Sequence, residues 1–146
     1  MSIRSARRAV ICAAAAALLA TPLLLPGCTL MNPAAPAQAV SLLEPVNGAT
    51  LSSPFKVRFG IRGMAVAPAG DIVANSGHHH LVINGGAVPA GESVPFTERY
   101  QHFGKGQTET EVTLPPGVYQ LTAQFANGAH QSYGQAMSQT ITVTVK

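Results

Sequence analysis

The sequence contains no tryptophan, few aromatic residues and few charges, and these scarcities exclude several classes of protein. Aromatic residues make up 5% of the 146 residues and charged residues 10%. Such a chain is poorly suited to stack nucleic-acid bases or to follow a phosphate backbone. Nine Lys and Arg residues stand against six Asp and Glu, but three of the nine are Arg4, Arg7 and Arg8. The remaining chain is electrically balanced, so we expect no nucleic-acid partner.

Cysteine is equally scarce. The two cysteines are Cys12 and Cys28, and none follows them. A folded domain after Cys28 can therefore contain neither a disulfide nor a thiolate metal site. Any metal ligands in that domain must be nitrogen, oxygen or thioether sulfur atoms.

The N-terminal segment has the pattern of a bacterial export signal. Three arginines lie within residues 1–8 and precede an uncharged, apolar run over residues 9–25, and the next charge is Glu44. The run is short for a spanning helix, which needs about 20 apolar residues. We therefore predict a signal peptide over residues 1–27.

Two cleavage sites are compatible with this signal. The segment Leu25-Pro26-Gly27-Cys28 resembles the lipobox of bacterial lipoproteins, in which cleavage precedes a lipid-modified cysteine. We favour this site, which makes Cys28 a lipid anchor in the outer membrane of the cell envelope and residues 28–39 a Pro/Ala-rich tether. The alternative is cleavage before Val40, which would release a soluble periplasmic protein.

From Val40 onward, Pro, Gly and Asn-Gly pairs interrupt the chain too often for a long helix. Residues 55–61 show strand-like alternation, with Phe55, Val57 and Phe59 on one face. The pattern predicts six strands, at residues 40–45, 55–61, 80–84, 110–114, 118–125 and 140–145. Six or seven short strands in a single domain, residues 40–146, are typical of an immunoglobulin-like antiparallel β-sandwich. A small barrel is the alternative.

The five histidines all lie in this domain, and three are consecutive. On a strand, His78 and His80 point to one face and His79 to the other. Same-face neighbours stand about 7 Å apart, so both imidazoles can reach one ion, and His102 or His130 can complete the site. Further candidate ligands are Glu109, Glu111, Met64 and Met137. Because a ligating imidazole must be neutral, we expect metal affinity to fall below about pH 6.5.

Other chemistry finds less support. Residues 102–109 read His-Phe-Gly-Lys-Gly-Gln-Thr-Glu, which lacks the spacing of a phosphate-binding loop, so no nucleotide site is expected. No G-x-S-x-G motif is present, and no acid and base pair can be assigned. We therefore expect a protein that is not an enzyme.

Several motifs together carry a resemblance to a known family. They are Gly-His-His-His-Leu at residues 77–81, the segment at residues 102–109, Pro-Pro-Gly at residues 115–117 and Pro-Val-Asn-Gly-Ala-Thr at residues 45–50. From about Leu43 to Val145 the chain resembles the bacterial domain-of-unknown-function family 4399. The resemblance implies an exported β-sandwich of unsettled biochemistry. Histidines common in that family stand where this chain has Tyr119 and Tyr133, so a ligand role does not carry over to those two positions.

The sequence thus favours an exported, lipid-anchored envelope protein whose histidines His78, His80, His102 and His130 bind divalent copper or zinc, for carriage or sensing. The alternative is a non-catalytic module that recognises an envelope protein or a glycan, with a structural histidine cluster whose hydrogen bonds organise the loops. A metal-dependent enzyme is the least favoured interpretation.

Overall fold

The computed structural model describes residues 37–146. The predicted signal peptide, the lipidation of Cys28 and most of the tether therefore lie outside the described residues. Among residues 37–146, no helix is long and apolar enough to cross a membrane. The first strand begins at Ala39, one residue before the predicted start of the domain.

The described chain forms nine strands and one short 3-10 helix. The strands are β1 (Ala39–Glu44), β2 (Thr50–Leu51), β3 (Phe55–Arg62), β4 (Ala65–Val66), β5 (Ser76–Ile83), β6 (Tyr100–His102), β7 (Glu109–Val112), β8 (Gly117–Ala126) and β9 (Ser138–Val145), and the helix is η1 (Gln135–Met137). All six predicted strands are present. The three strands that were not predicted, β2, β4 and β6, have two or three residues each and are too short to show alternation.

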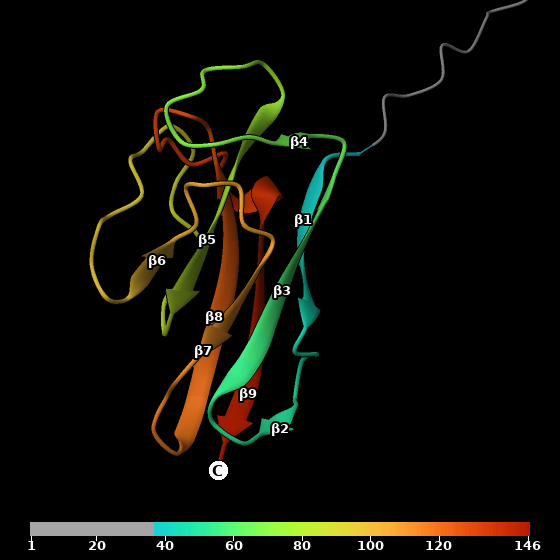
Figure 1. The fold of residues 1–146 in the computed structure, drawn as a ribbon, viewed down its shortest axis with the longest axis vertical. Helices are drawn as coiled ribbons and strands as arrows, with labels where there is room; N and C mark the ends of the chain where they lie inside the picture. Colours follow the sequence, from blue (N-terminus) through green and yellow to red (C-terminus); the bar gives the residue numbers. More distant parts are fainter. Residues whose placement is uncertain (1–36) are drawn as a thin grey trace, which may run out of the picture. The chain divides into compact units, whose positions relative to one another are not determined.

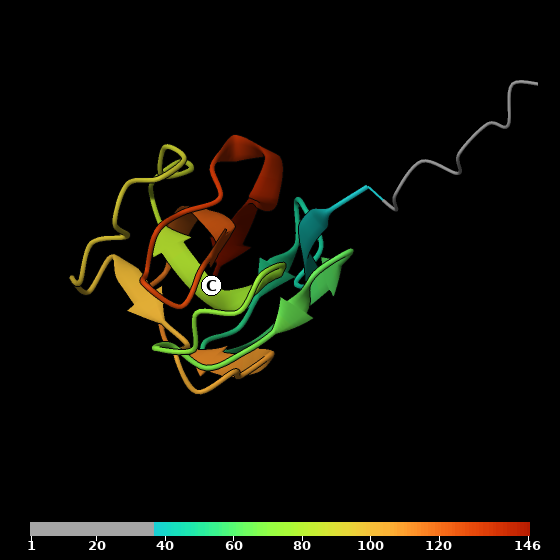
Figure 2. The same ribbon diagram turned by 90° about the horizontal axis from the view of Figure 1, so that it is seen from above.

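Two sheets pack against each other, which confirms the predicted all-β sandwich (Figures 1 and 2). One sheet has the strand order β1-β3-β7, and the other has the order β2-β9-β8-β5-β4 with β6 also paired to β5. The long strands pair antiparallel throughout. The two-residue strands β2 and β4 differ, because they pair parallel with β9 and β5.

This strand order is that of an immunoglobulin domain. Strands A, B and E of such a domain share one sheet, and strands C, F and G share the other. Here β1, β3 and β7 correspond to strands A, B and E, and β5, β8 and β9 correspond to strands C, F and G. The histidine-rich strand β5 is thus the equivalent of strand C, and in the larger sheet it lies between β8 on one side and the short strands β4 and β6 on the other.

A tyrosine at the start of β8 supports this assignment. The Tyr119 hydroxyl donates a hydrogen bond of 3.0 Å to the carbonyl oxygen of Pro115, four residues upstream. Immunoglobulin-like domains carry such a tyrosine at the start of strand F, two residues before a core position. Leu121 fills that core position and is fully buried. The segment Gly-Val-Tyr-Gln-Leu at residues 117–121 therefore indicates this topology in the sequence, in addition to the alternation of apolar residues.

The core lies between the sheets and is built from alternating positions. Leu121, Ala123 and Phe125 of β8 face Phe55, Val57 and Phe59 of β3, and all six side chains are buried. Every residue of β5 from Ser76 to Val82 is buried, so both faces of this strand are covered. The prediction placed the start of this strand at His80, four residues too late, because three histidines read as a polar segment.

Candidate metal centre

Strand β5 carries its three histidines on alternate faces, as predicted. His79 pairs with Phe125 of β8 and faces the core between the sheets, where its ring stacks on Phe59 at 4.8 Å between centroids. His78 and His80 pair with Ala126 and Gln124 and face the opposite side of the larger sheet. Both outward imidazoles are nevertheless buried, with exposures of 0% and 1%.

His102 reaches the cluster through strand β6. It pairs directly with His80, so the two imidazoles lie on the same face with their centroids 5.0 Å apart. Gly104 follows two residues later, and a Cβ atom there would overlap the imidazole of His102. The glycine in this motif therefore serves the histidine beside it and not a phosphate.

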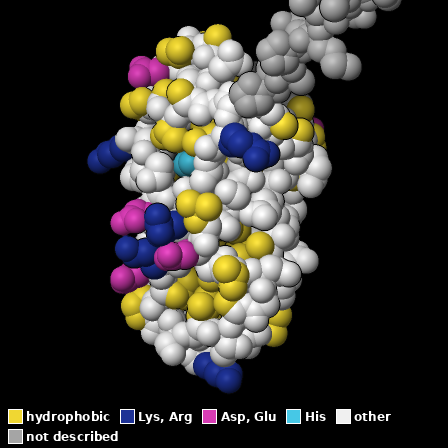
Figure 3. Space-filling view, turned by 90° about the vertical axis from the view of Figure 1, so that its right-hand side faces the viewer, with side chains coloured by type: hydrophobic (Ala, Val, Ile, Leu, Met, Phe, Trp, Pro, Cys, Tyr) yellow, Lys and Arg dark blue, Asp and Glu magenta, His cyan; other side chains and the backbone are white. Residues whose placement is uncertain are grey.

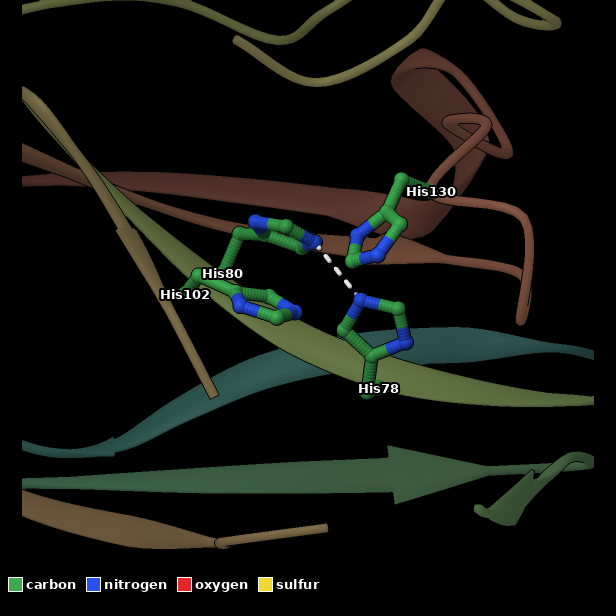
Figure 4. A group of neighbouring side chains, drawn as sticks. All are labelled: His78, His80, His102 and His130. Carbon is green, nitrogen blue, oxygen red and sulfur yellow. Dashed lines mark hydrogen bonds between the residues drawn. The ribbon is translucent and has the colours of Figure 1, made fainter. Parts of the chain in front are cut away.

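His130 completes the group from the connection between β8 and η1. Its ring lies 4.9 Å from the ring of His78 and 4.7 Å from that of His102, between centroids. One ring nitrogen from each of His78, His80, His102 and His130 can be chosen so that all four lie within 4.8 Å of one another. Figure 4 shows the four rings turned toward a common centre.

These separations are compatible with one metal ion. Imidazole nitrogens bind zinc at about 2.0–2.1 Å, which places tetrahedral ligand atoms about 3.4 Å apart. The Nε2 atoms of His78 and His80 are 3.0 Å apart. Modest rotations of the imidazoles would therefore bring all four nitrogens to bonding distance.

The ring nitrogens of the cluster also lack other partners. Within residues 37–146, the four imidazoles form a single hydrogen bond, which joins His78 and His80. His78 Nδ1, His80 Nδ1, His102 Nε2 and His130 Nδ1 are buried without a hydrogen-bond partner. A buried polar atom without a partner costs about 1–3 kcal/mol. A cluster that organised loops by hydrogen bonds would bond to those loops through its ring nitrogens, and none of these four atoms does so. Ligation would use one nitrogen of each ring, and through Nε2 of His78 and His80 it would leave their Nδ1 atoms unpartnered.

The environment favours the neutral form of three of these imidazoles. Burial is the main cause that lowers the pKa of His78 to about 4, and the nearby His102 and His130 contribute to that shift. Burial is also the main cause that lowers the pKa of His80 to about 3, and burial lowers the pKa of His102 as well. Neutral imidazole is the form that ligates metal. The expected loss of affinity near pH 6.5 therefore does not apply to His78 and His80, where protons compete with metal only at lower pH.

The carboxylates and thioethers considered as further ligands lie elsewhere. Glu109 and Glu111 are on β7 of the smaller sheet. The Glu109 carboxylate forms ion pairs with Lys56 Nζ at 3.6 Å and with Arg58 Nε at 3.8 Å. Basic and acidic side chains lie close together on this surface (Figure 3). Met137 is buried in the core, and Met64 is partly buried and packs against the core. Sequence spacing could not exclude these residues, because the sheet to which a strand belongs is decided by long-range pairing.

Neither Tyr119 nor Tyr133 joins the cluster. Tyr119 bonds to the Pro115 carbonyl, and Tyr133 donates to the carbonyl oxygen of Ser76 at 2.8 Å. Burial raises the pKa of the Tyr133 hydroxyl, which therefore stays protonated as a donor. Both tyrosines have structural contacts in place of a ligand role.

Two residues near the cluster were not identified by the sequence analysis. The ring of Phe96 lies edge-on to His102 and His130, at 5.5 and 5.0 Å between centroids, and is 66% exposed. Gln124 is fully buried beside His80, and its side chain bonds to Val88, Phe125, Gly134 and Met137. Phe96 thus stands at the solvent side of the site, and Gln124 fixes the segments that cover it.

His79 gives a prediction about stability. Its two ring nitrogens are buried with no hydrogen-bond partner, and burial lowers its pKa to about 4. His79→Leu removes both unpartnered atoms, which gains about 1–3 kcal/mol and outweighs a stacking loss of about 0.5–1.5 kcal/mol. We expect a Tm several degrees higher in a thermal melt at pH 7 with chelator present. His79→Gln, which keeps polar atoms in the core, should not raise the Tm, and a lower Tm for His79→Leu would contradict the prediction.

Comparison with known proteins gives one family match. The family described as Domain of unknown function (DUF4399) matches residues 57–146, which is more than half of the chain and includes all five histidines. The match agrees with the resemblance carried by the motifs at residues 77–81 and 102–109. No curated protein and no solved structure matches the chain.

Proposed function

We propose a function for this chain, which belongs to the DUF4399 family of unknown function. We propose that it is a non-catalytic metal-binding protein of the bacterial cell envelope. It binds one divalent copper or zinc ion, for carriage or sensing, through His78, His80, His102 and His130. The observation that carries this proposal is the convergence of four imidazoles whose ring nitrogens have almost no other partner.

The ligand set favours these two metals. Imidazole suits Cu(II) and Zn(II), whereas Cu(I) prefers thiolate and thioether sulfur. No cysteine follows Cys28, and the two methionines considered as ligands pack in the core or against it. In a site of nitrogen ligands, Cu(II) binds more tightly than Zn(II). We expect the protein to prefer Cu(II) when both ions are offered at equal concentration.

Metal titration tests this function. Isothermal titration of the untagged mature protein with Cu(II) or Zn(II) should show one equivalent bound, and metal analysis of protein purified from its native envelope should identify the physiological ion. A dissociation constant weaker than about 10 µM, roughly 7 kcal/mol of binding free energy, would remove the metal function. A module that recognises an envelope protein or a glycan would then be the better interpretation.

The envelope location rests on the N-terminal sequence. The proposal is that cleavage before Cys28 leaves a lipid-modified N-terminus, which holds the domain at the outer membrane through residues 28–39. Cys28→Ala should release the protein from the membrane fraction into the soluble fraction after cell fractionation. Thr29→Ala is a control that keeps the cysteine. Mass spectrometry that finds an unmodified N-terminus at Val40 would contradict lipidation and indicate a soluble periplasmic protein.

A further inference from the structure

His130 is held differently from the other three histidines of the cluster. His78 and His80 are on β5 and His102 is on β6, so sheet pairing fixes their backbones. His130 lies in a connection and has a φ of 62°, in the left-handed region. That conformation is unfavourable for a residue with a side chain, by roughly 1–2 kcal/mol. Other contacts must therefore hold His130 in place.

The side chain of Asn127 provides these contacts. Its Oδ1 accepts hydrogen bonds from the backbone amides of Ala129 at 2.9 Å and Gln131 at 3.0 Å, the two residues that flank His130. Its Nδ2 donates to Oε1 of Gln131 at 3.1 Å. One carboxamide thus binds the chain on both sides of the histidine.

The backbone of Asn127 adds to the same turn. The His130 amide donates to the Asn127 carbonyl oxygen at 2.9 Å, and the Asn127 amide donates to the Gln131 carbonyl oxygen at 2.9 Å. The His130 carbonyl oxygen accepts from the amide of Val94, also at 2.9 Å. None of these bonds involves the imidazole of His130, which stays free to face the other three rings.

We infer that Asn127 is the positioning residue for the fourth ligand, so that it decides whether the site presents four imidazoles or three. This inference rests on the proposed metal function and extends it to a residue that touches no metal. Asparagine is among the residues that support turns through side-chain bonds to nearby backbone amides. Alanine has no such acceptor, so it would keep the backbone bonds of this turn but remove the side-chain bonds that support the unfavourable conformation of His130.

The effect on metal binding is measurable. Asn127→Ala should weaken Cu(II) binding about 10- to 100-fold, the usual effect of removing a group that orients a ligand. The nitrogen splitting in the electron paramagnetic resonance spectrum of the Cu(II) protein should change from four nitrogens to three. Asn127→Asp keeps the acceptor oxygen and should retain most of the affinity and the four-nitrogen spectrum.

A double-mutant cycle separates positioning from general loss of structure. In a His130→Ala background, Asn127→Ala should have no further effect on affinity, because the ligand it positions is gone. Equal losses in both backgrounds would overturn the inference. Asn47→Ala is a matched control, since it removes a similar side-chain acceptor from the amide of Thr142. It should leave the affinity and the spectrum unchanged.

The metal-free protein gives a readout that does not depend on metal binding. The His130 imidazole lies within 5.0 Å of the rings of His78, His102 and Phe96, between centroids. Its Cε1 proton resonance should therefore be shifted by these rings and should move toward the value of a solvated imidazole in Asn127→Ala. An unchanged resonance would overturn the positioning role. A wild-type protein that binds no metal would instead contradict the proposed function, whatever this resonance shows.

Discussion

Replacing His80 with alanine is expected to weaken Cu(II) and Zn(II) binding at least a hundredfold, about 3 kcal/mol or more. His80 lies beside each of the other three histidines of the cluster. Its Nε2 atom is 3.0 Å from that of His78, and its ring centroid is 5.0 Å from that of His102 and 6.2 Å from that of His130. Its removal would leave three imidazole nitrogens to bind the metal. Isothermal titration of the untagged mature protein at pH 7 measures the change.

The matched control for this substitution is the neighbouring histidine. His79 faces the core on the other side of β5, so His79→Leu should change the dissociation constant by less than about threefold. Both variants alter one of three consecutive histidines in the same strand, and the two altered side chains lie on opposite faces. Similar losses from the two substitutions would show that the metal does not bind on the face shared by His78 and His80.

The stability of the metal-free domain should fall steeply between about pH 6.5 and pH 4. In the folded protein, burial lowers the pKa values of His78 and His79 to about 4 and that of His80 to about 3, whereas unfolded histidine has a pKa near 6.5. The unfolded chain therefore binds more protons in this range. The stability is complete above pH 6.5, is lost as the pH falls, and levels off below the folded pKa values.

The expected magnitude is large for a domain of this size. Each histidine contributes at most roughly 1.4 kcal/mol per pH unit, so three contribute at most about 4 kcal/mol per unit, against a typical total of about 5–15 kcal/mol. Thermal melts from pH 7.5 to pH 4 with chelator should show this decline, and it should be shallower in His79→Leu. A Tm that stays constant over this range would refute the prediction.

Bound metal should oppose this acid unfolding. A ligand that binds only the folded state adds stability that grows with the ratio of its concentration to the dissociation constant. Saturating Zn(II) should therefore move the acid midpoint to lower pH in the wild type and much less in His80→Ala. Metal release on acidification would then accompany loss of the fold, since His78 and His80 titrate well below their reference value.

The local pattern of the sequence determined much of this protein. Two-residue alternation placed His78 and His80 on one face and His79 on the other, because successive side chains of any strand point to opposite sides. The frequent Gly and Pro residues and the alternating apolar positions indicated a sandwich of short strands. The lack of cysteine after Cys28 limited a metal site in the domain to nitrogen, oxygen or thioether ligands. Each of these conclusions depends on neighbours in the chain or on composition alone.

The tertiary structure decided what the site contains. His102 and His130 join His78 and His80 because β6 pairs with β5 and a turn held by Asn127 approaches the same face. Glu109 stands on the other sheet, and Phe96 reaches the cluster from a long connection. Burial of both faces of β5 also lowers the pKa values, which no local pattern shows. Contacts between residues far apart in sequence depend on how strands pair and on which surfaces become covered, and those are properties of the folded chain as a whole.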